Sequence, residues 1–175
     1  MTDPRYPIGK YEPQPFSIEQ KIEWLADIKF LPHLLEASIL NLDEAQLNMP
    51  YREGGWTINQ LVHHVADSHM NAYIRFRLGL TEDNPTIRPY DEKAWAELYD
   101  VKKLPINVSI TLLHALHVRW HETLISIADE EWNNRTVFHP EHKKTMRLWF
   151  LLGMYAWHGK HHVAHITQFR ERMGY

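Results

Sequence analysis

Apolar residues recur every three or four positions in four long stretches of the chain, which is the period of an amphipathic helix. The stretches cover residues 17–42, about 57–80, about 107–128 and about 146–172. Little of the remaining chain alternates between apolar and polar residues as a strand would. Because long helices joined by loops pack their apolar stripes together, the pattern predicts an all-α fold, a four-helix bundle.

The same periodicity predicts which face of each helix is buried. For the first helix we expect Ile18, Ile22 and Leu25 on the buried face, with Ile28 at its margin and a kink at Pro32. For the second helix we expect a stripe of Ile58, Leu61, Val62, Val65, Ala72 and Phe76. For the third we expect Val108, Leu112, Leu116 and Leu124. Ser17 with Gln20 and Thr57 with Gln60 have the spacing of capping boxes, which predicts where the first two helices begin.

The connections between these stretches are long. Residues 1–16 hold four prolines and are expected to form an extended N-terminal arm, and residues 81–106 to form a long connection with a short helix around Trp95. The segment "RTVFHPEHKKTMRL" predicts a short hairpin or a loop. Two connections are long enough to cross the ends of the bundle, so simple up-down-up-down topology is not required. We interpret residues 1–175 as a single domain.

Composition excludes several classes of function. The chain has no cysteine, which excludes disulfides, a thiolate nucleophile and a cysteine-ligated metal site. The net charge of −3 gives no basic excess, so we expect no nucleic-acid partner. The sequence contains no run of about 18 apolar residues, so it predicts no membrane span, and its N-terminus carries no apolar signal region. We therefore expect a cytoplasmic protein without a membrane partner.

The candidate chemistry lies in the fourth predicted helix. The stretch "WHGKHHVAHI" places His158, His161, His162 and His165 on or beside the apolar stripe. A buried imidazole nitrogen without a partner costs about 1–3 kcal/mol, and a metal ion is a natural common partner for several of them. His161 and His165 are four residues apart, so both rings can reach one ion at about 2.0–2.1 Å.

A third ligand would have to come from another helix. The second predicted helix contains "HHVADSHM", with His63, His64, Asp67 and His69. His69 is nearest the centre of the apolar stripe and His64 lies at its margin, so periodicity does not choose between them. Asp67 could orient a ligand, although we favour its interpretation as a solvated residue. Three neutral histidines leave a coordination position open, as in catalytic sites, and all-nitrogen ligation favours zinc (Zn²⁺), with nickel (Ni²⁺) or Co²⁺ as alternatives.

The segments "WTINQLVHHVADSHMNAYIRFRL" and "LGMYAWHGKHHVAHITQFR" resemble the DinB-like, damage-inducible superfamily, and most of all its YfiT branch of metal-dependent hydrolases. The segments "YPIGKYEP" and "PTIRPYDEKAWAEL" are similar to that branch as well. The resemblance therefore covers most of the chain. It implies a four-helix bundle with one divalent metal held by three histidines.

The resemblance also implies which histidines bind the metal. The family pattern His-hydrophobic-small-acid matches "HVAD" and implies His64 as one ligand. The pattern His-x-x-x-His-x-x-Gln implies His161 and His165 as the other two, followed by Gln168. The family usually has Arg-Gly immediately before this glutamine, whereas this chain has Ile-Thr, so any shared role of those two positions is not implied.

Three functions are compatible with such a site. The leading hypothesis is a metal-dependent hydrolase, in which the three-histidine centre activates water against a small-molecule substrate. The second is an S-transferase that uses a low-molecular-weight thiol of the bacillithiol type, because the chain supplies no cysteine of its own. The third is a metal-binding stress protein without turnover. Apolar residues left on outer helix faces predict a homodimer.

Overall fold

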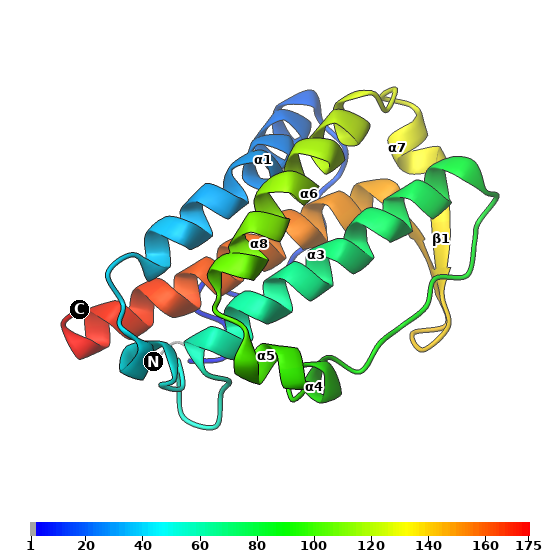
Figure 1. The fold of residues 1–175 in the computed structure, drawn as a ribbon. Helices are drawn as coiled ribbons and strands as arrows, with labels where there is room; N and C mark the ends of the chain where they lie inside the picture. The colour runs from blue at the N-terminus through cyan, green and yellow to red at the C-terminus, as the bar shows by residue number, and fades with distance from the viewer. Residues whose placement is uncertain (1–2) are drawn as a thin grey trace.

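The computed structural model describes residues 3–175 and confirms the predicted four-helix bundle (Figure 1). The long helices are α1 (Ile18–Ile39), α3 (Ile58–Thr81), α6 (Asn107–Ile125) and α8 (Leu148–Met173). Helix α1 packs against α6 and α8, and α3 packs against the same two helices. Helices α1 and α3 therefore occupy opposite corners of the bundle. None of the helices within the described range is long and apolar enough to cross a lipid bilayer.

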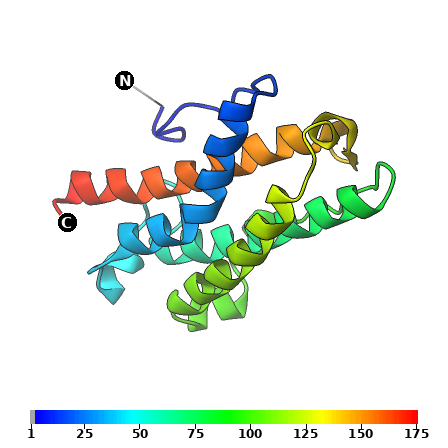
Figure 2. The same ribbon diagram turned by 90° about the horizontal axis from the view of Figure 1, so that it is seen from above.

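The bundle does not follow a simple up-down-up-down path. Helices α1 and α8 run in one direction and α3 and α6 in the other, so two pairs of neighbours are parallel (Figures 1 and 2). The connection from α3 to α6 must cross the length of the bundle, and it contains α4 (Glu92–Trp95) and α5 (Tyr99–Lys103). This crossover carries α4 to the end of the bundle where α3 begins.

The other connections are short elements that close the ends of the bundle. Helix α2 (Glu44–Leu47) lies between α1 and α3, and α7 (Glu131–Asn134) follows α6. Strands β1 (Thr136–His139) and β2 (Lys144–Arg147) pair antiparallel, so the segment predicted as a hairpin or a loop is a hairpin.

The N-terminal arm lies along α8 and is extended from residue 10 onward, whereas residues 3–9 form two turns; residues 1–2 lie outside the described range. The indole of Trp149 donates a hydrogen bond to the Gln14 carbonyl at 2.7 Å, and the indole of Trp157 donates to the Gly9 carbonyl at 3.2 Å. These two bonds hold the arm against the same helix that carries the histidines of "WHGKHHVAHI".

The predicted stripe of α3 is confirmed, because all six of its apolar residues are fully buried. The predicted faces of α1 and α6 are partly wrong. Ile18 and Ile22 are 43% and 62% exposed, and Val108 and Leu112 are 46% and 40% exposed. Each helix is turned so that a tryptophan faces the core instead, Trp24 on α1 and Trp120 on α6. A tryptophan removes more apolar area from water than an isoleucine or valine, so its burial sets the rotation of the helix.

The helix starts agree with the capping patterns, with one difference. Thr57 and Gln60 form a complete capping box at α3. Ser17 caps α1 by accepting from the Gln20 amide, but the Gln20 side chain donates to Glu23 instead of returning to Ser17. Helix α1 continues through Pro32, and its axis changes direction along its length in Figure 2, as expected of a helix with an internal proline.

The apolar core is divided into two clusters. One surrounds Trp120 and Trp149, and the other surrounds Leu61 and Phe169. Each long helix contributes one part of its length to the first cluster and the neighbouring part to the second. A layer of histidines lies between the two clusters. We use the term histidine layer for the set His64, His69, His117, His158 and His162.

Candidate metal centre

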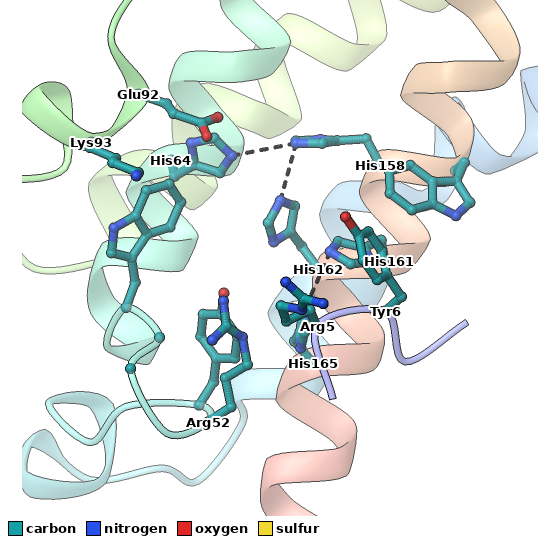
Figure 3. A pocket seen from close by; sticks show the side chains of 15 residues that line it. Arg5, Tyr6, Arg52, His64, Glu92, Lys93, His158, His161, His162 and His165 are labelled. Carbon is teal, nitrogen blue, oxygen red and sulfur yellow. Dashed lines mark hydrogen bonds between the residues drawn. The ribbon is translucent and has the colours of Figure 1, made fainter. Parts of the chain in front are cut away.

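Three members of the histidine layer bring their Nε2 atoms together at the base of a pocket (Figure 3). The Nε2 atom of His158 lies 3.4 Å from that of His64 and 3.1 Å from that of His162. His64 comes from α3, whereas His158 and His162 lie one turn apart on α8. The site therefore joins two helices that pack side by side but are far apart in the sequence.

The predicted pair His161 and His165 does not join this group of three. Their Nε2 atoms lie 3.1 Å from each other, on the wall of the same pocket. His161 stacks on the indole of Trp157 with ring centroids 4.6 Å apart, and His165 lies 4.4 Å from the ring of Tyr51. The structure thus brings the predicted His64 together with His158 and His162, which belong to the same histidine-rich stretch but were not selected from the sequence.

One other group of three donors in residues 3–175 is close enough for a single ion. It consists of His33 and Glu36 on α1 and His114 on α6, and the ring of His114 contacts the Glu36 carboxylate at 3.0 Å. Two of its three members are exposed on the outer surface of the bundle, and the Glu36 carboxylate already has the His114 ring as a hydrogen-bond partner. It therefore competes poorly with the buried group as a candidate centre.

Burial keeps the three converging histidines neutral. It lowers the pKa of His64 to about 4 and holds the pKa values of His158 and His162 well below the usual 6.5. Burial also lowers the pKa of His161 to about 4. A histidine must be unprotonated at a ring nitrogen to bind a metal ion, so this environment keeps the rings available as ligands at neutral pH.

The pocket above the three nitrogens has a volume of about 470 Å³, and its mouth carries mostly positive charge. Arg5 comes from the N-terminal arm, Arg52 from the loop before α3, and Lys93 from α4, while Glu92 is the one acidic residue among residues 3–175 that lines it (Figure 3). The Nε atom of Arg52 is buried and has no hydrogen-bond partner in the described part of the chain. Its Nη1 donates only to the neighbouring Glu53 carbonyl, at 3.1 Å.

The remaining members of the histidine layer connect the site to the far side of the bundle. His158 Nδ1 lies 3.3 Å from His69 Nε2, and His69 Nδ1 lies 3.0 Å from His117 Nε2. His117 Nδ1 reaches the main-chain carbonyl of Ile28 on α1. Periodicity had placed His69 at the centre of its apolar stripe, and it is fully buried, but it contacts a ring at the site instead of belonging to the group of three.

Asp67 lies one turn after His64, but it is not part of the group of three donors. Its carboxyl is about half buried, and burial together with the nearby Asp100 raises its pKa to about 6. It is therefore neither the fully solvated residue that we favoured nor a partner of the converging nitrogens.

The raised pKa predicts how Asp67 affects stability. The folded chain binds this proton more tightly than the unfolded chain, so the contribution favours folding below the unfolded value of 3.8 and is lost as pH rises through about 6. We expect Asp67→Asn to stabilise the metal-free protein at pH 8 by about 1 kcal/mol after solvent screening, with the gain vanishing at pH 4. Denaturant unfolding at both pH values measures the change in the free energy of unfolding. Asp83→Asn is the control, because Asp83 is exposed. Equal effects of the two variants would contradict the prediction.

Comparison with known proteins gives consistent matches over nearly the whole chain. The family model described as the DinB superfamily matches residues 27–166. Relatives named "Putative metal-dependent hydrolase" from Bacillus cereus and Bacillus anthracis are 51% and 50% identical over 176 residues, covering 100% of each chain. A solved structure titled "YfiT from Bacillus subtilis is a probable metal-dependent hydrolase with an unusual four-helix bundle topology" superposes with a TM-score of 0.95, at 47% identity and over 98% of each chain.

Proposed function

The chain belongs to the DinB superfamily and is of the YfiT type, and from this membership and its own pocket we propose that it is a metal-dependent hydrolase whose divalent ion is held by His64, His158 and His162. The observation that carries the proposal is the convergence of three neutral imidazole nitrogens, from two buried histidines and one half-buried histidine, at the base of one open pocket. A bound divalent ion supplies a Lewis acid that activates water at neutral pH.

The three nitrogens fit one ion by their spacing. Ligand nitrogens about 2.0–2.1 Å from an ion, at tetrahedral or octahedral angles, lie about 2.9–3.4 Å from each other. The observed separations of 3.1 and 3.4 Å around His158 fall in this range. Three neutral nitrogens facing one another cannot all be satisfied by hydrogen bonds among themselves, so a cation is the partner that suits them.

Aromatic side chains support the proposed ligands from the pocket wall. The ring of Trp56 lies 4.7 Å from that of His64, which restricts the rotation of that imidazole. Elsewhere on the pocket wall, the ring of His161 packs against that of Trp157, and the ring of His165 packs against that of Tyr51. The sequence-derived ligand set His64, His161 and His165 is the competing proposal. It is less favoured, because His161 and His165 do not belong to the group whose donor atoms all lie close enough to His64 for one ion.

The charge of the pocket mouth favours a substrate with an anionic group. Arg52 has an unused buried Nε donor, and Lys93 adds positive charge at the same opening, whereas Arg5 is already paired with Asp3 at 2.8 Å. A carboxylate or phosphate held there would complete the hydrogen bonding of a guanidinium that has no acidic partner among residues 3–175. We therefore propose that Arg52 positions the anionic part of the substrate beside the metal centre.

Replacement of Arg52 by glutamine should weaken the binding of small anions to the zinc-loaded protein. A charge-assisted hydrogen bond contributes about 1.5–3 kcal/mol, so the dissociation constant of phosphate or succinate should rise about tenfold or more. Titration calorimetry measures this. Arg77→Gln is the matched control, because Arg77 is exposed and bonds only to Tyr73. Equal anion binding by wild type and Arg52→Gln would contradict the role of Arg52 without affecting the metal proposal.

The reaction class is tested by assaying zinc- and nickel-loaded protein against carboxylic esters, amides and phosphoesters that carry an anionic group. We expect turnover that a chelator abolishes and that needs no added thiol. Thiol-dependent conjugation of an electrophile would favour the S-transferase instead, and a loaded protein that turns over neither kind of substrate would favour a binding role. The homodimer and the choice between zinc and nickel remain predictions.

A further inference from the structure

One histidine of the proposed centre is tied to the main chain on the opposite side of the bundle. From His158 on α8 the contacts pass to His69 on α3, then to His117 on α6, and end at the carbonyl of Ile28 on α1. Each of the four long helices contributes one member. His69 and His117 are 0% and 2% exposed, so neither ring can complete its hydrogen bonding with bulk water.

The direction of every hydrogen bond in this series of contacts follows from the carbonyl of Ile28, at which the series ends. A carbonyl oxygen only accepts, so His117 Nδ1 must carry a hydrogen. A neutral imidazole has one N–H, so His117 Nε2 is bare and accepts from His69 Nδ1–H. His69 Nε2 is then bare as well, and it accepts from His158 Nδ1–H. His158 is left with a bare Nε2, which is the atom that faces His64 and His162.

The surroundings of His69 and His117 keep both rings neutral. The groups that contact His69 are the rings of His117, His158, Trp120 and Tyr155, and none of them is a carboxylate. An imidazolium buried without a counter-ion is strongly disfavoured, and burial accordingly lowers the pKa of His117 to about 4.

We infer that His69 and His117 are positioning residues that fix His158 as its Nδ1–H tautomer and so present an unprotonated Nε2 to the metal centre. Metal-binding histidines are commonly oriented by a carbonyl or carboxylate on the other ring nitrogen. In this protein two further histidines extend that contact across the bundle. His162 has no comparable support, because its Nδ1 is buried without a partner among the described residues. The use of the tautomer rests on the proposed function, but the tautomer itself does not.

The tautomer can be measured in metal-free protein by long-range ¹H–¹⁵N correlation spectra, which distinguish bare from protonated ring nitrogens. In the wild type we expect a bare Nε2 at His158. His69→Leu removes the acceptor for His158 Nδ1–H, so both tautomers should appear and zinc affinity should fall about 10- to 100-fold. His69→Gln places an amide oxygen near the position of the lost Nε2, so it should restore the wild-type tautomer and most of the affinity.

His63→Leu is the matched control. His63 is a buried histidine of the same helix, but it contacts Ser109 and the Leu104 carbonyl and takes no part in the hydrogen bonds that link His158, His69 and His117. It should change neither the His158 spectrum nor the affinity. A protonated Nε2 at His158 in the wild type would overturn the inference without any variant having to fold. Unchanged spectra and affinity in His69→Leu would overturn it too. Failure of the metal proposal would be seen separately, as absence of zinc binding by the wild type.

Discussion

Replacing His162 by alanine should abolish tight metal binding, whereas replacing His161 by alanine should leave the affinity within about threefold of the wild type. Loss of one of three nitrogen ligands removes more than the 10- to 100-fold that is typical when only a supporting group of a ligand is lost. We therefore expect the zinc dissociation constant of His162→Ala to rise by at least about a hundredfold. Competition with a chromophoric chelator, together with metal analysis of the purified variants, measures both.

The two variants are closely matched. His161 and His162 are adjacent, both are buried, and both line the same pocket. A loss of affinity through general disturbance of α8 would therefore appear in both. The reverse result, with binding lost in His161→Ala and retained in His162→Ala, would reinstate His161 and His165 as the ligands. His158→Ala should behave like His162→Ala, and His165→Ala like His161→Ala.

Removal of the metal should lower the thermal stability of the wild-type protein substantially. An ion that binds only the folded chain stabilises it by about 4 kcal/mol when its free concentration is a thousand times the dissociation constant. For a chain of 175 residues each kcal/mol corresponds to about 2–4 °C, so chelation should lower the midpoint by about 8–16 °C. Scanning calorimetry at fixed free zinc, with and without chelator, measures the shift.

The histidine layer explains why the folded protein should bind the ion tightly. Without a cation, the Nε2 atoms of His64, His158 and His162 face one another, and hydrogen bonds between them satisfy only part of the group. The ion therefore stabilises the layer as well as linking α3 to α8. His162→Ala supplies the control, since chelation should hardly move its midpoint. A midpoint in the wild type that is independent of free zinc would contradict metal binding in the bundle.

The architecture was predictable because α3 and α8 show helical periodicity over more than twenty residues each. The rotation of α1 and α6 was less predictable. Isoleucine and leucine recur on two faces of each helix, and only packing decides that Trp24 and Trp120 point inward. The local sequence pattern therefore predicts where the helices lie, whereas packing against neighbouring helices decides which face of α1 and α6 is buried.

The family resemblance implied His64 together with His161 and His165, whereas the structure places His158 and His162 beside His64. The stretch on α8 contains two pairs of histidines four residues apart, so spacing alone does not choose between the pairs. A wheel at 100° per residue offers a signal that separates them. Leu148 and Ile166, which are fully buried, lie about 40° from His162 and about 140° from His161 on that wheel. Centring the comparison on these two residues would have favoured His158 with His162.

No signal of that kind exists for His117. It is one of three histidines on α6, with His114 and His121, and their spacing does not single it out as a contact of the candidate centre. Its role depends on the carbonyl of Ile28, a backbone atom that leaves no trace in the residue type. Contacts of a side chain with main-chain atoms of a distant helix arise only from the three-dimensional arrangement.

The division of the core into two apolar clusters has a consequence for protein design. Leucine and phenylalanine placed at the positions of the histidine layer would join the clusters into one unbroken column. Exchange of both partners of a buried hydrogen bond for apolar groups of the same shape can be nearly neutral or stabilising. We therefore expect a bundle with apolar residues at these five positions to keep its fold and to lose its metal chemistry.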